Sequence, residues 1–251
     1  MKKNVEAIIL AGGKMDDSDM AKSAIVLNGE RILGRIVAAL VGSKHVGRII
    51  LVGDVDRKDP IFRGVDAFAK PGDSMMTSLV AGIKEVKDPT KRVLGLCCDL
   101  PFLTPNGVDD GIECCQARPE AQLCYCIVER ERYVQMFPDV PRTYARLRDK
   151  NWKRKHYCAT GLVMIHPAIV NQIVKRVEAL YRKKKNVLAL AWELGLLEIL
   201  LYLLGLCHVP IVEQTMSRIL DIRGAAVEVH DPRLSVNADK MRDLELVAKY
   251  G

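Results

Sequence analysis

The sequence predicts an α/β fold: a Rossmann-like, mostly parallel sheet in three layers, with helices on both faces. Three observations predict it. Short apolar runs, with no polar alternation, alternate with longer segments of helical spacing. Glycine or proline closes most of the early runs. The 251 residues are also enough for one core and too few for three domains, so a single domain over residues 1–251 is expected.

In the first half of the chain, strands and helices follow each other regularly. The first apolar run leads into Ala11-Gly12-Gly13, the third closes at Pro71-Gly72 and the fourth closes at Pro101. Strands are predicted at residues 5–10, 48–52, 65–69, 93–98 and 123–128, and helices at residues 32–40, 74–86 and 106–116.

The pattern loosens after residue 130. Residues 138–157 are basic and irregular. Later elements are predicted as strands at residues 162–165, 207–213 and 226–229, and as helices at residues 167–182 and 239–249. The region of about 131–215 therefore has no specific assignment from its pattern.

Composition narrows the class of protein. Hydrophobic residues make up 49% and charged residues 27%, which excludes disorder along the whole chain. Lys and Arg number 38 against 31 Asp and Glu, and this net charge of +7 favours anionic partners. Aromatic residues are only 5% and no RNA-binding motif is present, so no nucleic-acid partner is expected.

The cysteines and the N-terminus indicate a compartment. None of the eight cysteines forms a Cys-x-x-Cys pair or has a His at zinc-finger spacing, and five lie in apolar runs. We interpret those five as small hydrophobic residues, with a metal or redox role as the alternative. Free thiols and an N-terminal apolar run too short for a secretory signal predict a cytoplasmic protein.

Residues 187–207 are almost wholly apolar and follow a basic run. Eleven Leu and Ile residues favour membrane insertion by roughly 0.5 kcal/mol each, and Glu193 and Glu198 oppose it by roughly 2.5–3.5 kcal/mol each. The sum is near zero, so hydropathy alone leaves a membrane span open. We favour a buried or subunit-interface helix, which predicts a homodimer and no membrane span.

The first candidate site is the turn after the first strand, Leu10-Ala11-Gly12-Gly13-Lys14, with Lys22 further on. Two glycines let backbone N–H groups approach an anion closely, and lysines at both ends of the loop could hold phosphates. The spacing matches neither a P-loop nor Gly-x-Gly-x-x-Gly, and a plain turn is the alternative.

The second and third candidates carry carboxylates. Asp99 ends a hydrophobic strand, at the edge of a parallel sheet where ligands bind, and a carboxylate facing a polyphosphate suits Mg²⁺. Asn237 and Asp239 are two residues apart, so both point to one side of an extended segment. Asp99 and Asp239 could share one metal ion. As alternatives, Asp99 is a turn residue before Pro101, and Asp239 is the N-cap of the final helix.

Taken together and in this chain order, these motifs resemble the MobA-like NTP transferase family. The resemblance rests on Leu10-Ala11-Gly12-Gly13 with a later Lys, on Asp99-Leu100-Pro101-Phe102-Leu103, and on Asn237-x-Asp239-x-x-x-Asp243-Leu244. It covers most of residues 4–130 and 220–248.

The resemblance implies roles for these residues. Asp99 would bind Mg²⁺, with Asp239, or less favourably Asn237, as the second ligand. Lys14 and Lys22 would contact the triphosphate. The nucleotide would be bound by Leu10, Ala11, Gly12, Gly13, Lys14, Lys22, Gly72, Ser78 and Asp99, with Lys14, Lys22 and Asp99 catalytic.

The acceptor side is less defined. Gly161 lies in a segment weakly similar to a loop that lines the acceptor site in the family. The basic stretch of residues 142–155 could receive an anionic acceptor, with Lys153 or Lys155 as the contact, or it could be a solvated surface loop. The region of about 131–215 is thus expected to serve acceptor binding or oligomerisation.

The implied reaction is transfer of an NMP from an NTP to a phosphorylated small-molecule acceptor, with release of pyrophosphate and dependence on Mg²⁺. One departure stands against it: many members carry an Arg in the glycine loop, where this chain has Asp17. The alternatives are a sugar-1-phosphate nucleotidyltransferase and a non-catalytic nucleotide-binding protein.

Overall fold

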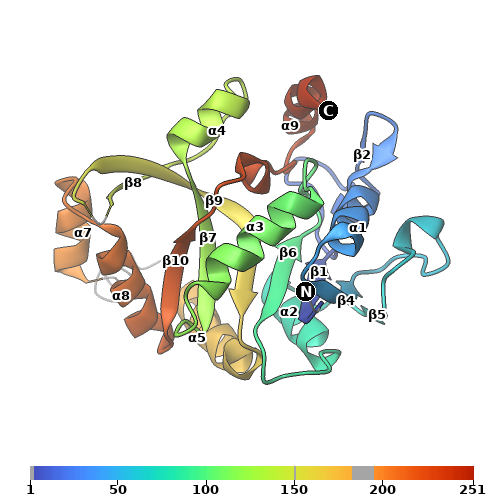
Figure 1. Cartoon of the computed structure of the whole chain (residues 1–251), viewed down its shortest axis with the longest axis horizontal. Coiled ribbons are helices and arrows are strands. Elements are labelled where there is room, and N and C mark those ends of the chain that lie inside the picture. Colours follow the sequence, from blue (N-terminus) through green and yellow to red (C-terminus); the bar gives the residue numbers. More distant parts are fainter. Residues whose placement is uncertain (1–2, 150, 183–194) are drawn as a thin grey trace.

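The computed structural model describes residues 3–149, 151–182 and 195–251. A central sheet carries helices on both faces (Figure 1), as the sequence predicts. The strands of this sheet are β1 (Val5–Leu10), β4 (Val46–Val52), β5 (Ala67–Ala69), β6 (Val93–Cys97), β7 (Leu123–Glu129), β8 (Ala145–Arg148), β9 (Arg154–Ile165) and β10 (Gly224–Glu228). The helices are α1 (Ile32–Gly42), α2 (Met75–Lys84), α3 (Pro105–Gln116), α4 (Arg130–Met136), α5 (Val170–Arg182), α7 (Leu196–Leu203), α8 (Val209–Leu220) and α9 (Met241–Val247).

The sheet order is β10-β7-β9-β6-β1-β4-β5, and β8 pairs with β9. Every neighbouring pair is parallel except those made by β9, which runs antiparallel to β6, β7 and β8. The mostly parallel sheet is therefore confirmed, and β9 is inserted against the direction of the other strands. The carboxyl ends of β1 and β6 consequently lie side by side, since Leu10 pairs with Cys97.

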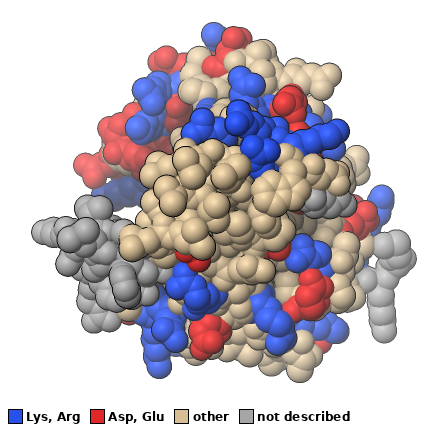
Figure 2. Space-filling view, turned by 90° about the vertical axis from the view of Figure 1, so that its left-hand side faces the viewer, with Lys and Arg blue, Asp and Glu red and all other residues tan. Residues whose placement is uncertain are grey.

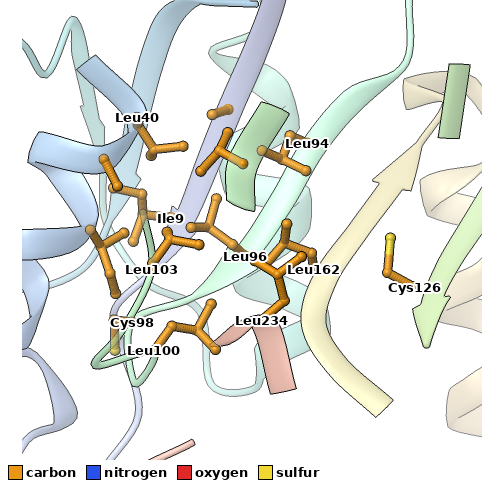
Figure 3. Packing of buried hydrophobic residues seen from close by; sticks show 14 of the residues in the cluster. Ile9, Leu40, Leu94, Leu96, Cys98, Leu100, Leu103, Cys126, Leu162 and Leu234 are labelled. Atoms are coloured by element: carbon orange, nitrogen blue, oxygen red, sulfur yellow. The ribbon is translucent and has the colours of Figure 1, made fainter. Parts of the chain in front are cut away.

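Successive residues of each strand point to opposite faces of the sheet, and this builds two apolar layers. Along β1, Ala7 and Ile9 pack on the face covered by α1 and α3, whereas Ile8 packs on the face covered by α2 and α5. The first layer continues through Leu94, Leu96 and Leu162 to Leu234 (Figure 3). Both faces of the sheet are covered, which explains why these strands read as unbroken apolar runs.

Several predicted elements need correction. Residues 207–213 were expected as a strand, but α8 begins at Val209, with Pro210 in its first turn and Thr215, Ile219 and Leu220 on its buried side. Proline fits the first helical turn because its missing N–H would be unpaired there. The strand predicted at residues 162–165 extends back to Arg154 as β9. The final helix begins at Met241, so Asp239 lies outside it.

The cysteine prediction is confirmed for the apolar runs: Cys98, Cys124, Cys126 and Cys207 are buried and Cys97 is half-buried. All eight cysteines of the chain are free thiols.

The apolar segment at 187–207 is described only from residue 195. There it forms α7, which ends at Leu203 and has no buried residue, so a fully buried helix is wrong for this part. Its exposed side chains are Leu196, Leu197, Leu200, Tyr202 and Leu203. Figure 2 shows the side of the molecule that carries α7 and α8, where an uncharged surface lies beneath a band of Lys and Arg. The predicted homodimer stays a prediction.

None of the helices in the described part of the chain combines the length and apolar character that crossing a bilayer demands.

Candidate functional site

A cleft of about 310 Å³ opens at the carboxyl ends of β1 and β6. The residues around it come from the glycine turn, from the start of α2 and from the end of β6. They are Leu10, Gly12, Gly13, Lys14, Lys22, Gly72, Asp73, Ser74, Met75, Ser78, Cys97, Cys98 and Asp99. With one exception, this set contains every residue predicted to bind the nucleotide. The exception is Ala11, which is buried and packs against Gly53.

The glycine turn is held close to the segment that precedes α2. A Cβ atom on Gly12 would lie 2.7 Å from Cβ of Pro71, too close for any side chain at this position unless Pro71 moved. A Cβ atom on Gly13 would approach only Cδ of Lys22, at 3.8 Å. Gly12 is thus needed for packing, and Gly13 leaves the backbone open toward the cleft.

The start of α2 provides the opposite wall. Ser74 caps the helix by accepting a hydrogen bond from the backbone N–H of Thr77, and Ser78 Oγ accepts one from the N–H of Gly72 at 3.0 Å. A helix N-terminus of this kind favours negative charge, because its first N–H groups point outward and the helix dipole is positive there. The wall is therefore suited to phosphate oxygens.

Three side chains from distant parts of the chain meet at the base of the cleft. The ammonium of Lys22 lies between two carboxylates, 2.6 Å from Oδ2 of Asp99 and hydrogen-bonded to Oδ1 of Asp239. Asn237 Nδ2 donates to Oδ1 of Asp99 at 3.3 Å, and the N–H of Ala238 donates to the Asp99 carbonyl at 3.0 Å. The predicted convergence of Asp99, Asn237 and Asp239 is confirmed as geometry.

Burial and the ion pairs of Lys22 act against each other on the pKa values of these three groups. Asp99 is only 3% exposed, and burial raises its pKa although the charge of Lys22 opposes the shift. Burial also acts to raise the pKa of Asp239, but the hydrogen bond and charge of Lys22 outweigh it, so that pKa lies below its ordinary value. Burial acts to lower the pKa of Lys22, but the two carboxylates raise this pKa by more. The pKa of Lys22 therefore lies above its ordinary value, and the lysine stays charged.

Asp239 does not cap the final helix. Its side chain reaches Lys22 instead, while the backbone N–H of Met241 donates to the carboxylate of Asp17. The backbone N–H of Asp16 donates to the carbonyl of Asp239 at 2.9 Å. The loop after the glycine turn thus fastens the segment that presents Asp239.

These contacts also account for the acidic loop, whose charges would repel a triphosphate if they faced the cleft. Asp17 is turned to the start of α9, and Asp19 pairs at 2.8 Å with Lys14 on the exposed side of the loop. Lys14 still borders the cleft, so both predicted phosphate-binding lysines lie at its edge.

The predicted acceptor residues are divided between two places. Gly161 lies against the Asp99 loop, where a Cβ atom on it would be 2.6 Å from Cδ2 of Leu100. Lys155 pairs with Glu129 at 2.8 Å, and Lys153 belongs to the turn before β9. Six residues of extended strand separate Lys155 from Gly161, a span of about 20 Å. The structure therefore does not bring the two lysines to the cleft.

Arg142 is a residue that sequence reasoning did not single out. It is part of the predicted basic stretch, and its charge is close enough to contribute to the lowered pKa of Asp239. Its Nη2 atom donates to the Ala159 carbonyl at 2.8 Å, while its Nε atom is buried without a partner among the described residues. No sequence pattern distinguishes Arg142 from the basic residues around it.

Comparisons with known proteins give a family and a shared fold. The model of the family described as MobA-like NTP transferase domain matches residues 7–196. A solved structure described as a hypothetical transferase from Thermus thermophilus is 25% identical, with a TM-score of 0.80 over 96% of this chain and 99% of its own. A comparison with curated proteins finds no match.

Two more distant structures share the fold. A CMP:2-keto-3-deoxy-manno-octonic acid synthetase complexed with CTP is 12% identical, with a TM-score of 0.66 over 98% of each chain. A 4-diphosphocytidyl-2C-methyl-D-erythritol synthase from Anaerococcus prevotii is 16% identical, with a TM-score of 0.57 over 99% of this chain and 96% of its own.

Proposed function

The chain belongs to the MobA-like NTP transferase family, and from this premise we propose that it transfers an NMP from an NTP to a phosphorylated small-molecule acceptor. In the proposed reaction an acceptor oxygen attacks the α-phosphorus, the bond to the bridging oxygen breaks, and pyrophosphate leaves. The observation that carries the proposal is the meeting of Lys22, Asp99 and Asp239 at the base of a glycine-lined cleft.

Asp99, which lines the cleft, and the residues that meet it there suit a divalent cation. Asp99, Asp239 and Asn237 offer oxygen ligands, which Mg²⁺ prefers. The Oδ1 atom of Asn237 is buried and has no hydrogen-bond partner in the described part of the chain, so it is available to a ligand. We therefore propose Asp99 and Asp239 as Mg²⁺ ligands, with Asn237 beside them. When bound, Mg²⁺ would neutralise the charge that develops on the leaving phosphate oxygens.

The protein's own groups would then bind and orient the nucleotide. Lys14 and Lys22 would attract the β- and γ-phosphates, and the N-terminus of α2 at Ser74 would favour their charge. Gly12 and Gly13 would let the backbone approach the phosphates. The glycine turn and the N-terminus of α2 are in place before the reaction, whereas Lys14 would leave Asp19 and Lys22 would leave the two carboxylates to contact the phosphates.

The proposal is tested first with nucleotides. ATP, CTP, GTP and UTP are compared, with and without Mg²⁺, by thermal shift and by pyrophosphate release in the presence of sugar phosphates and other phosphorylated acceptors. CTP is the first choice, because the distant structures are named for cytidylyl products. We expect at least one NTP to stabilise the protein by about 2.7 kcal/mol at a hundredfold excess over its dissociation constant. Binding without turnover on any acceptor would favour a non-catalytic nucleotide-binding protein.

We further propose that Arg142 contacts the anionic group of the acceptor. The charge of Arg142 contributes to the lowered pKa of Asp239, and its Nε atom is buried without a partner among the described residues. Lys155, in contrast, is engaged by Glu129. Arg142→Met should raise the KM for the acceptor about tenfold or more, with little change in the KM for the NTP, since only one charged hydrogen bond is lost. Lys153→Met is the matched control, because it removes a cation from the same stretch outside the cleft. The assignment is wrong if Lys153→Met has the larger effect on the acceptor KM.

A further inference from the structure

Three potential metal ligands lie together away from the nucleotide cleft. Asp110 and Cys114 are four residues apart on α3 and share one side of the helix, and His230 follows β10. The Sγ atom of Cys114 is 3.6 Å from both Nδ1 of His230 and Oδ1 of Asp110, and these last two atoms are 2.7 Å apart. Within residues 3–149, 151–182 and 195–251, this is the one group of three such side chains whose ligand atoms lie within 4.8 Å of one another.

These separations match those of a zinc site. With bonds of about 2.3 Å to sulfur and about 2.1 Å to nitrogen or oxygen, a tetrahedral ion places sulfur about 3.6 Å from each of the other two ligand atoms. Both sulfur distances in the cluster have this value. Only the nitrogen–oxygen pair, now hydrogen-bonded at 2.7 Å, would have to open, to about 3.4 Å.

We propose that Asp110, Cys114 and His230 bind a Zn²⁺ ion, with water in the fourth position. On binding, the thiol proton of Cys114 is released to solvent, and the proton between His230 and Asp110 leaves Nδ1, so that the neutral imidazole carries its proton on Nε2 while the metal binds Nδ1. The site is reachable, since the His230 side chain is 62% exposed. A soft thiolate with an imidazole selects zinc over Mg²⁺, so this site and the nucleotide cleft would bind different metals.

Two features around the cluster support a cation. The Oδ2 atom of Asp110 accepts the backbone N–H groups of His230 at 2.7 Å and Asp231 at 3.1 Å, which fixes the carboxylate and leaves Oδ1 toward the other ligands. The carboxylates of Glu113 and Glu228 lie close enough to act on the Cys114 thiol. Hydrogen bonding alone explains how Asp110 holds His230, but it does not require a cysteine at 114.

Because of where the site lies, a bound ion would also hold together two parts of the fold. His230 begins the segment that runs through the short helix Pro232–Ser235 to Asn237 and Asp239 at the cleft. An ion bound to Asp110 and Cys114 would tie the start of this segment to α3. Zinc binding should therefore stabilise the fold as well as occupy the site.

The test uses Co²⁺ as a spectroscopic substitute, with the full chain, a reductant that does not bind metal and excess Mg²⁺ to occupy the oxygen ligands. We expect one equivalent of Co²⁺ to give a thiolate-to-cobalt charge-transfer band that Zn²⁺ abolishes. Cys114→Ser should remove this band and lower the affinity for Zn²⁺ by roughly a hundredfold or more. His230→Asn should weaken binding as well. Cys97→Ser is the matched control, because Cys97 is the other half-buried thiol, and it should keep the band.

Either of two results would overturn the proposal: no band in the wild-type protein, or a band that survives Cys114→Ser. If Cys114→Ser does not fold, a second measurement decides. Zn²⁺ should slow the modification of Cys114 by a thiol reagent tenfold or more in the wild-type protein. It should not slow this modification in His230→Asn, which replaces a largely exposed side chain and should fold normally. Equal protection in both proteins would contradict the site.

Discussion

Asp99→Asn should reduce the turnover of nucleotide by about a thousandfold or more, which corresponds to about 4 kcal/mol of transition-state stabilisation. The variant keeps the shape of a side chain that is only 3% exposed, so the cleft should stay intact. It removes the negative charge that, in our proposal, holds Mg²⁺ beside the triphosphate. The Mg²⁺-dependent part of the NTP thermal shift should disappear with the activity.

Asp109→Asn is the matched control, because Asp109 is also a buried carboxylate but does not border the cleft. It accepts hydrogen bonds from Ser43 Oγ at 2.6 Å and from the N–H of Lys44 at 3.0 Å, in the connection between α1 and β4. Its replacement should lower stability without changing turnover per folded molecule. Pyrophosphate release is measured for both variants at saturating NTP and Mg²⁺. An Asp99→Asn protein with more than a tenth of the wild-type rate would show that Asp99 is not the metal ligand.

The strands of the parallel sheet could be predicted because they are buried on both faces, which leaves an unbroken apolar run in the sequence. β9 could be predicted only at its end, residues 162–165, where it is covered on both faces. Its first three residues, Arg154 to His156, are exposed or half-buried and carry charges that resemble a loop. α8 was missed because His208 to Glu213 is too short and too apolar to show a helical period on its own.

Some features of the candidate site could likewise be predicted from the sequence, and others could not. Gly12, Gly13 and Asp99 follow directly after strands, and the topology of a parallel sheet brings such positions together. Lys22 was predicted to contact the triphosphate, but its ion pairs could not be predicted, since the contact with Asp99 spans 77 residues and that with Asp239 spans 217. The same holds for Asp17, which occupies the position of an expected arginine but turns to the N–H of Met241. Pairing over such distances depends on tertiary packing that no local pattern carries.

Lys22→Met should lower the stability of the metal-free protein and increase the stabilisation by Mg²⁺. The side chain of Lys22 is only 16% exposed and pairs with both carboxylates. Without it, two negative charges face each other in a largely buried place. Removing one partner of a buried ion pair costs about 3–5 kcal/mol, and the 38% exposure of the Asp239 side chain reduces this to about 2–3 kcal/mol here. Urea unfolding in EDTA measures this loss.

The loss of stability caused by Lys22→Met should be smaller at low pH than at high pH. Burial already raises the pKa of Asp99, and Lys22 is the charge that opposes this shift, so the pKa of Asp99 should rise further in the variant. A carboxyl whose pKa is higher in the folded than in the unfolded state stabilises the fold below its unfolded pKa, and this contribution is lost as the pH rises through the folded value. Relative to wild type, the variant should therefore be less destabilised at pH 5 than at pH 8. Lys14→Met, whose partner Asp19 is fully exposed, should show no such dependence.

Mg²⁺ should restore much of what Lys22→Met loses, because a divalent cation between Asp99 and Asp239 replaces the missing ammonium. We expect the Mg²⁺-induced rise in Tm to be larger for the variant than for the wild type, while pyrophosphate release falls about a hundredfold because a phosphate-binding charge is missing. This combination separates a shared metal site from a purely structural salt bridge. If Mg²⁺ stabilises the variant no more than the wild type, the two carboxylates do not bind one ion, and Lys22 serves only to neutralise them.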